Sequence, residues 1–375
     1  MFDPQRVESL PERHEDHDVT EGQSSAAPVP RSRHVDASVR SHDRLTAYRT
    51  ATLPPRRPPA EETAISAAGG FPLSVFLSGA YGNGSLMFPD FTLEHISLDE
   101  VSLRVRHGGT GPAVLLIHGH PRTHTTWHRL APLLAQEYTV VCPDLRGYGQ
   151  SSKPPTDGRH ETYSKRRMAA DCLRLMTALG HETFHVVGHD RGGYVATRLA
   201  LDHPRAVTHL TALDIVPIAE ALERCDADFA TRWWHWFFRA QPHPGPETII
   251  GSNLSLWYQD TAEQMGEESW QDLQNALSDP RTIHAMCEDY RAGLGVDNEH
   301  DLADRRAGRR VQCPTLAVWG EESDLPDLYD DITGIWQSWA DGPVTGRSVK
   351  SGHHLAEDAP GELARVLRAA WAACA

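Results

Sequence analysis

The stretch VVGHDRGGYVATRLALDHP, from Val186 to Pro204, decides the fold. Its beginning is a short apolar run typical of a strand buried on both faces, and its second half has the spacing of a helix. Between them, Gly188, Asp190 and Gly192 form the pattern G-x-D-x-G. The serine form of this pattern marks a sharp strand-to-helix turn that presents a nucleophile. We therefore predict the same turn here, with a carboxylate at its centre.

Strand and helix patterns alternate on both sides of this turn. Buried strands are predicted for AVLLIHG, YTVVCPDL, VTHLTALDIV and CPTLAVWG, helices for TWHRLAPLLAQE, MAADCLRLMTALG and APGELARVLRAAWAA, and a hairpin for FTLEHISLDEVSLRVRHGG. Such alternation predicts the α/β class, with a mostly parallel central sheet flanked by helices on both faces. We assign residues 87–216 and 311–375 to this core.

Two segments depart from the alternation. Residues 217–310 contain aromatic clusters such as RWWHWFF and no strand pattern, which indicates an inserted helical cap. Residues 1–86 are rich in Pro, Arg, Ser and acidic residues, a composition that buries too little apolar surface to fold, so we expect a disordered N-terminal extension. Because Met87 directly precedes the first strand pattern, we also expect that translation could start there.

Composition limits the classes of partner. The 375 residues carry a net charge of −15, which argues against nucleic acid or an anionic membrane. No apolar run is long enough to span a membrane, and the N-terminus has no secretory signal pattern. The six cysteines form no CxxC pair, which favours free thiols in a reducing cytoplasm. We expect a cytoplasmic protein that acts on a small molecule.

The residues around the turn suggest a two-step hydrolysis. A carboxylate at Asp190 can displace a leaving group from saturated carbon and form an ester, which an activated water must then hydrolyse. In the chain order nucleophile, acid, histidine, Asp214 and His353 are the candidates for the acid and the base. Asp324, after the next strand, is the alternative acid. The backbone N–H groups of His120 and Arg191 are expected to form the oxyanion hole.

At this point the sequence resembles the α/β-hydrolase superfamily, specifically its Asp-nucleophile branch of dehalogenases and epoxide hydrolases. The likeness to fluoroacetate (haloacetate) dehalogenases is carried by DLRGYGQSSKP, GHDRGG, LDIVP, WHWFF, CEDYRAG and SGHH. It covers nearly all of residues 87–375, and implies an α/β-hydrolase fold without cofactor or metal. The resemblance also suggests a homodimer.

Site roles follow from this resemblance residue by residue. Arg191 would bind the substrate carboxylate, and His235, Trp236 and Tyr290 of the cap would hold the departing halide. The family usually has a second arginine four residues after the nucleophile, where this chain has Tyr194. Tyr194 can still offer one hydrogen bond to a substrate. We expect Arg198, one helical turn further on, to point away from the site.

Two other functions remain open. Epoxide hydrolysis would use the same Asp-His-Asp triad, with cap tyrosines such as Tyr290 and Tyr258 protonating the opened oxygen. A protein on this fold that binds a ligand without catalysis is the third possibility, although the complete triad argues against it. Halide release measured beside diol formation distinguishes the two enzymatic functions.

Overall fold

The structure is a computed structural model that describes residues 87–373. The expected disorder of residues 1–86, and the expected translation start that would remove them, concern a segment outside this range. The described chain contains one sheet with the strand order β1-β2-β4-β3-β5-β6-β7-β8. Its strands are β1 (Thr92–Ser97), β2 (Ser102–Gly108), β3 (Ala113–Ile117), β4 (Thr139–Pro143), β5 (Phe184–His189), β6 (Val207–Leu213), β7 (Thr315–Gly320) and β8 (Val344–Val349).

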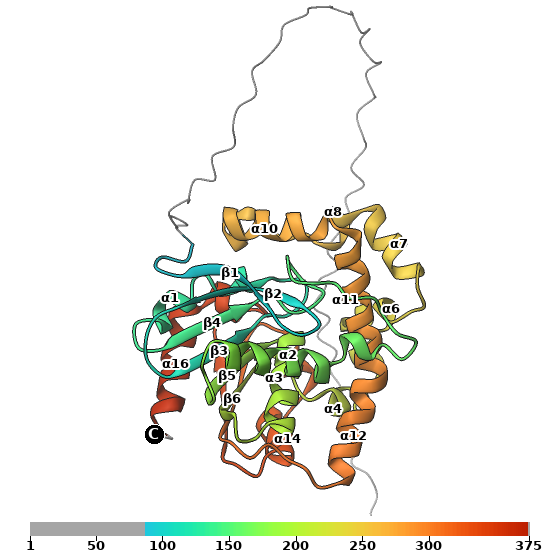
Figure 1. The fold of residues 1–375 in the computed structure, drawn as a ribbon. Coiled ribbons are helices and arrows are strands. Elements are labelled where there is room, and N and C mark those ends of the chain that lie inside the picture. Colours follow the sequence, from blue (N-terminus) through green and yellow to red (C-terminus); the bar gives the residue numbers. More distant parts are fainter. Residues whose placement is uncertain (1–86, 374–375) are drawn as a thin grey trace, which may run out of the picture. The chain divides into compact units, whose positions relative to one another are not determined.

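The sheet has the predicted mostly parallel topology (Figure 1). The predicted hairpin is the antiparallel pair β1 and β2, and β2 also runs antiparallel to β4. All other neighbouring strands are parallel, from β4 through β3, β5, β6 and β7 to β8. Parallel strands direct their carboxyl ends to one edge, so the turns after β3, β5 and β6 meet there.

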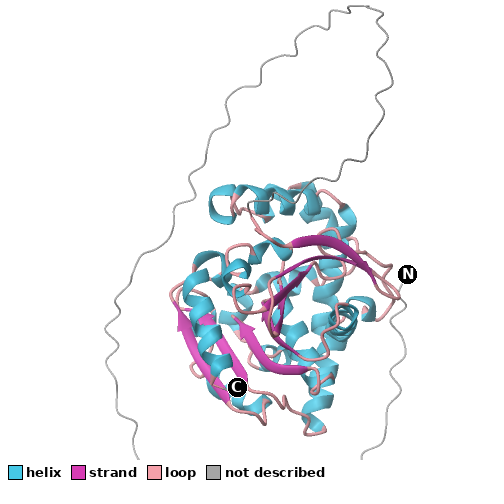
Figure 2. Ribbon diagram, turned by 60° about the vertical axis from the view of Figure 1, so that its left-hand side comes forward, coloured by secondary structure: helices cyan, strands magenta, loops and turns pink. Residues whose placement is uncertain are grey.

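Helices cover both faces of the sheet, as Figure 2 shows. On one face α2, α3 and α14 share an apolar core with the cap, whereas α1 and α16 enclose a second core on the other face. The helices and 3₁₀ turns of this part are η1 (His124–Trp127), α1 (Ala131–Leu134), η2 (Glu161–Tyr163), α2 (Lys165–Ala178), α3 (Arg191–Asp202), α13 (Leu325–Leu328), α14 (Ile332–Trp339), α15 (Leu355–Asp358) and α16 (Pro360–Ala372). The predicted fold class is therefore confirmed.

A helical insertion separates β6 from β7. It consists of α4 (Ile218–Glu223), α5 (Ala227–Arg232), α6 (Trp234–Arg239), α7 (Gly245–Ser252), α8 (Leu254–Trp257), α9 (Ala262–Met265), α10 (Glu267–Leu277), α11 (Pro280–Ala292), the π-helical turn η3 (Gly293–Asp297) and α12 (Asn298–Arg306). Among the described residues it contains no strand, and we call residues 217–310 the cap, as in the predicted division.

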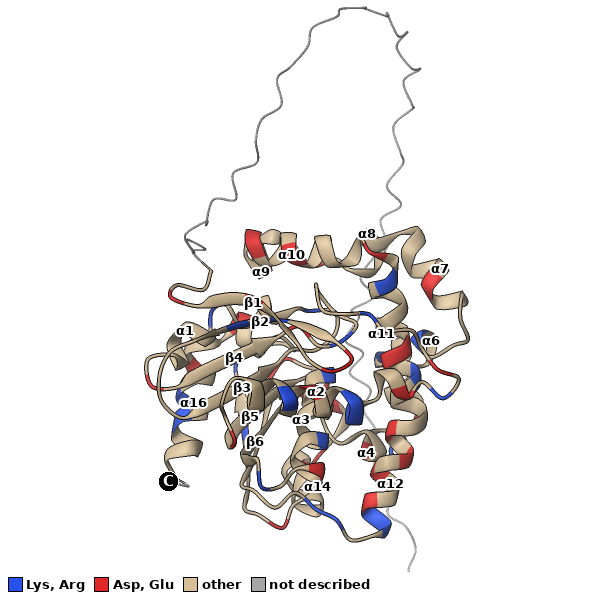
Figure 3. Cartoon of the chain, in the orientation of Figure 1, with Lys and Arg blue, Asp and Glu red and all other residues tan. Residues whose placement is uncertain are grey.

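Buried ion pairs join the cap to the core. Figure 3 shows acidic residues along α11 and α12, the cap helices that lie beside α2 and α3. Asp289 of α11 pairs with Lys165, and with Arg191 at 3.1 Å. Asp301 of α12 pairs with Arg198 at 2.8 Å. Because these charges are buried, they hold the cap on the core only as long as both partners are present.

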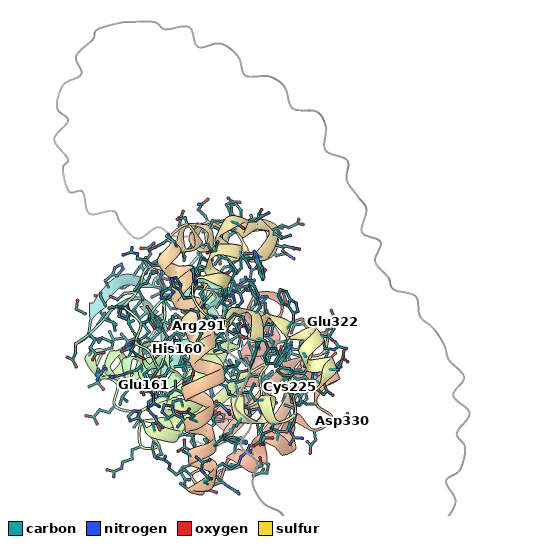
Figure 4. The ribbon with its side chains drawn as sticks, turned by 90° about the vertical axis from the view of Figure 1, so that its right-hand side faces the viewer. His160, Glu161, Cys225, Arg291, Glu322 and Asp330 are labelled. Carbon is teal, nitrogen blue, oxygen red and sulfur yellow. The ribbon has the colours of Figure 1, made fainter. Side chains whose placement is uncertain are left out.

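Three details differ from the expectations or extend them. The edge strand β8 went unpredicted because its sequence, VTGRSV, mixes a glycine and exposed polar residues. The stretch TWHRLAPLLAQE forms only the short helices η1 and α1 instead of one continuous helix. All five described cysteines are free, but Cys225 is exposed (Figure 4), unlike the four buried ones. Within residues 87–373, every helix is too short or too polar to cross a membrane.

Candidate active site

Asp190 occupies the predicted sharp turn between β5 and α3. Its φ of 49° is unusual for a residue with a side chain, and such a conformation costs on the order of 1–3 kcal/mol. The flanking glycines permit the turn, because a Cβ on Gly188 would lie 2.3 Å from the carbonyl oxygen of Gly192. The backbone N–H of His120, which follows β3, donates to Oδ1 of Asp190 at 2.7 Å. The turn thus presents the carboxylate with one oxygen already hydrogen-bonded.

His353 lies between two carboxylates. Its Nδ1 is 2.7 Å from Oδ2 of Asp214, and its Nε2 is 3.9 Å from Oδ2 of Asp190. The other oxygen of Asp214 accepts from the backbone N–H of Gly320 at 3.0 Å and from the hydroxyl of Ser323 at 2.8 Å. These bonds fix Asp214 so that it orients the imidazole toward Asp190, the arrangement of a nucleophile, a base and an acid.

The alternative acid, Asp324, lies in a different environment. It also lines the cavity at the site, but its carboxylate pairs with Arg232 at 3.0 Å and accepts from the indole N–H of Trp233 at 3.3 Å. Its side chain is 45% exposed, whereas that of Asp214 is 2% exposed. The structure therefore brings His353 to Asp214 and leaves Asp324 to an ion pair with the cap.

A cavity of about 260 Å³ lies above Asp190. Its walls include the cap residues predicted to hold a halide, together with the unexpected tyrosine of α3: His235, Trp236, Tyr290 and Tyr194. None of these four side chains makes a hydrogen bond to any other described residue. Each can donate one hydrogen bond to a ligand, through an imidazole or indole N–H or a phenol O–H. The cavity is small, and both the cap and α3 contribute hydrogen-bond donors to its lining.

Burial keeps these donors neutral. It lowers the pKa of His235 to about 4, with the positive charge of Arg239 as the next cause. Burial, and then the charge of Asp190, raise the pKa of Tyr290, so its hydroxyl stays protonated. The pKa of His353 moves the opposite way from that of His235. Although burial acts to lower it, the hydrogen bond and charge of Asp214 outweigh burial and raise it above 6.5.

The side chain of Arg191 lies behind the cavity wall instead of lining it. Its guanidinium contacts Asp289 through Nε and Nη2, stacks on the ring of Tyr290 at 4.2 Å, and has a buried Nη1 with no partner in the described chain. Gly293 makes room for it, because a Cβ there would lie 2.6 Å from Nη2. Arg198 points away from the site, as expected, toward Asp301.

Three residues at or beside the site were not singled out by the sequence reasoning. Asp289 lies in the motif CEDYRAG without an assigned role, and it pairs with both Arg191 and Lys165. His354 lines the cavity with an unpaired Nδ1. Arg239 is buried in the cap beside the ring of Tyr290. A signal for Arg239 was available, because it follows His235 by four residues and therefore lies on the same helical face.

Comparisons with known proteins agree with this geometry. The family profile described as "alpha/beta hydrolase fold" matches residues 112–360. The fluoroacetate dehalogenase of a Burkholderia species is 41% identical over 292 residues, which cover 75% of this chain and 94% of that protein. The soluble epoxide hydrolase of Corynebacterium sp. (strain C12) is 31% identical over 262 residues, which cover 67% of this chain and 87% of that protein.

Solved structures give the same result. The crystal structure of a protein from Nostoc sp. PCC 7120, described as an alpha/beta hydrolase, superposes with a TM-score of 0.72 at 41% identity. The likeness covers 75% of this chain and 98% of that one. The profile match, the two relatives and the shared architecture show that this chain belongs to the α/β-hydrolase family and resembles its haloacetate dehalogenases.

Proposed function

We propose that this protein is a hydrolytic dehalogenase of small halo acids of the haloacetate type. One observation carries the proposal: the Asp190 carboxylate lines a cavity of about 260 Å³ whose lining also holds several neutral hydrogen-bond donors without partners in the described chain. A carboxylate can attack saturated carbon on one side, while donors on the other side stabilise the halide that leaves. The 41% identity to a fluoroacetate dehalogenase supports this function.

In the first step, Oδ2 of Asp190 attacks the carbon that carries the halogen. The new C–O bond forms as the carbon–halogen bond breaks, and the bonding pair leaves with the halide. The indole N–H of Trp236, the imidazole N–H of His235 and the hydroxyl of Tyr290 are the donors available to the departing ion. Fluoride accepts hydrogen bonds strongly, so donors placed where its charge develops lower the barrier.

In the second step, His353 removes a proton from water, and the hydroxide attacks the carbonyl carbon of the Asp190 ester. Negative charge then develops on Oδ1, which already accepts the N–H of His120 at 2.7 Å. Collapse of this intermediate breaks the bond between the acyl carbon and Oδ2, and the departing alkoxide takes the proton from the imidazolium of His353 to give the 2-hydroxy acid. The Asp190 carboxyl group then loses its proton to solvent, which restores the carboxylate. Asp214 stabilises the imidazolium formed meanwhile, because its carboxylate contacts Nδ1 of His353 at 2.7 Å.

The test is an assay of halide release over a panel of fluoro-, chloro- and bromo-acids. Asp190→Asn is the matched control, because the amide keeps the size of the side chain and cannot form the ester. We expect release by the wild-type protein and none by the variant. Equal release by both, or no release from any member of the panel, would overturn the proposal.

Epoxide hydrolysis is the second candidate, favoured by the 31% identical soluble epoxide hydrolase. The opened epoxide oxygen needs a proton donor, and the hydroxyl of Tyr290 lines the cavity. Tyr258, the second tyrosine considered, instead has its hydroxyl beside Arg239 at 3.2 Å and does not line the cavity. Of the two cap tyrosines considered, only Tyr290 lines the cavity, so we place this function second. Diol formation from an epoxide panel without halide release would reverse the order.

Two further expectations accompany the proposal. The free cysteines of the described chain suit a reducing cytoplasm, where we expect the protein to act. We also expect a homodimer, which sedimentation at assay concentrations would detect.

A further inference from the structure

Arg239 is a buried cation without a carboxylate partner. Its side chain is 5% exposed, and no acidic oxygen of the described chain lies within 4.0 Å of it. Its Nη1 donates to the hydroxyl of Tyr258 at 3.2 Å, and its Nε is buried with no partner in the described chain. A buried charge without a counterion is costly, so its retention needs an explanation.

Three other buried arginines pair with carboxylates, whereas Arg106, which lies 5.1 Å from the ring of Phe88, shares with Arg239 a buried Nε without a partner in the described chain. Arg122 pairs with Glu357 and Asp260, both at 2.8 Å. Arg146 pairs with Asp171, and Arg198 with Asp301. The side chain of Arg239 instead lies among aromatic rings. Its guanidinium carbon is 5.5 Å from the ring centre of Tyr290 and 5.6 Å from the ring centre of Tyr258.

Arg239 borders the cavity through Tyr290, whose ring lines it and lies 5.5 Å from the guanidinium carbon. After burial, the charge of Arg239 is the main cause that lowers the pKa of both His120 and His235, two residues that line the cavity. His120 is itself unusual, since both ring nitrogens are buried and unpaired in the described chain. The neutral histidines do not offset the positive charge of Arg239, which has no carboxylate partner in the described chain. Arg191 contributes less, because Asp289 neutralises it.

We propose that Arg239 determines the specificity for a substrate that carries a carboxylate. It takes over the role of the second arginine that the family usually has on α3, where this chain has Tyr194. It supplies from the cap the positive charge that α3 lacks at that position. The inference rests on the proposed function, in that it names the anionic group of the same substrate. Arg239 acts from behind Tyr290 and His120, so it positions the acid electrostatically and takes no part in bond breaking.

The test compares an acid with its neutral isostere, chloroacetate with chloroacetamide, in Arg239→Met and Arg239→Lys. Removing one positive charge near the substrate, at an effective dielectric of about 20, changes affinity by about 10- to 50-fold. Arg239→Met should therefore raise the KM for chloroacetate by about that factor with little change in kcat, and leave chloroacetamide unaffected. Arg239→Lys, which keeps the charge, should restore most of the affinity.

Thermal unfolding separates selection from a structural role. Arg239→Met breaks no ion pair, so its Tm should stay unchanged or rise, whereas the control Arg198→Met, which strands Asp301, should lower it. A fall in Tm for Arg239→Met, together with an equal loss of activity toward chloroacetate and chloroacetamide, would overturn the inference. So would a lower kcat for both substrates, which would assign Arg239 to the leaving halide.

The outcome also separates this inference from the proposed function. If halide is released and Arg239→Met leaves the KM for chloroacetate unchanged, the inference fails and the function stands. If no halo acid is turned over, the function fails, and calorimetric titration with glycolate tests the inference alone. Weaker glycolate binding by Arg239→Met than by the wild-type protein then supports it, and equal binding refutes it.

Discussion

Replacing Asp214 by Asn tests the mechanism most directly, because it changes one atom of a fully bonded group. Oδ1 of Asp214 accepts from Gly320 and Ser323, and Oδ2 contacts Nδ1 of His353. The amide oxygen of Asn will accept the hydrogen bonds from Gly320 and Ser323, since the amide nitrogen cannot accept a hydrogen bond. The NH₂ group must then face Nδ1 and donate to it, so the single proton of the neutral imidazole moves to Nε2.

A protonated Nε2 cannot take a proton from water. The same substitution in a serine-protease triad lowers kcat by about 10⁴-fold through the wrong tautomer, and we expect a loss of about 10³–10⁴-fold in ester hydrolysis here. Attack by Asp190 does not need the base, so the first turnover should remain fast. Halide should appear as a burst equal to the enzyme concentration, followed by a slow steady rate.

The assay is rapid-mixing halide detection with mass spectrometry of the quenched protein. Asp324→Asn is the control. It breaks the ion pair between Asp324 and Arg232, in which the side chain of Asp324 is 45% exposed, so it should change the rate by no more than a few-fold. The reasoning fails if Asp214→Asn retains more than a tenth of the steady-state rate, or if Asp324→Asn loses more activity than Asp214→Asn.

Three other predictions follow from the same geometry. His353→Gln should form the ester and not hydrolyse it, so mass spectrometry should find the substrate fragment on Asp190; normal turnover without an adduct would contradict the two-step mechanism. His353 can act as a base only when it is neutral, and its pKa is raised. The rate of ester hydrolysis should therefore increase with pH, with a midpoint above pH 6.5, and a midpoint below pH 6.5 in single-turnover experiments would contradict this prediction. Tyr194→Arg should lower the KM for haloacetates by about 10-fold and give neutral epoxides no benefit, and a large fall in Tm with uniform loss of rate would remove Tyr194 from the site.

Much of the architecture was predictable because it depends on local patterns. Apolar runs and helical spacing marked seven of the eight strands and the flanking helices α2, α3 and α16. The strand β8, with its exposed polar residues, and the helix α14 went unpredicted. The turn at Asp190 was recognisable because its glycines are required where backbones approach closely. Chain order placed Asp214 and His353 as partners, and the structure brings them within 2.7 Å.

What escaped prediction depends on contacts between distant segments. Arg191 was expected to face the substrate, but Asp289, 98 residues further along the chain, holds its side chain behind the wall. The lack of an acid near Arg239 cannot be read from its neighbours in sequence, because every helix of the cap could in principle have supplied one. Local sequence therefore identifies which groups are reactive, whereas tertiary packing decides which charges remain unbalanced.

The attachment of Asp289 has a consequence for how molecules enter and leave. This one carboxylate of the cap contacts Lys165, Arg191 and the hydroxyl of Tyr148, which come from three separate segments of the core. Lifting α11 would strand several buried charges at once, at a cost of about 3–5 kcal/mol for each broken pair. His160 of the core, labelled in Figure 4, adds a contact at 2.7 Å to Glu288 on the same helix. We therefore predict that α11 stays in place during turnover, and that substrate and product pass by rotation of side chains around the cavity.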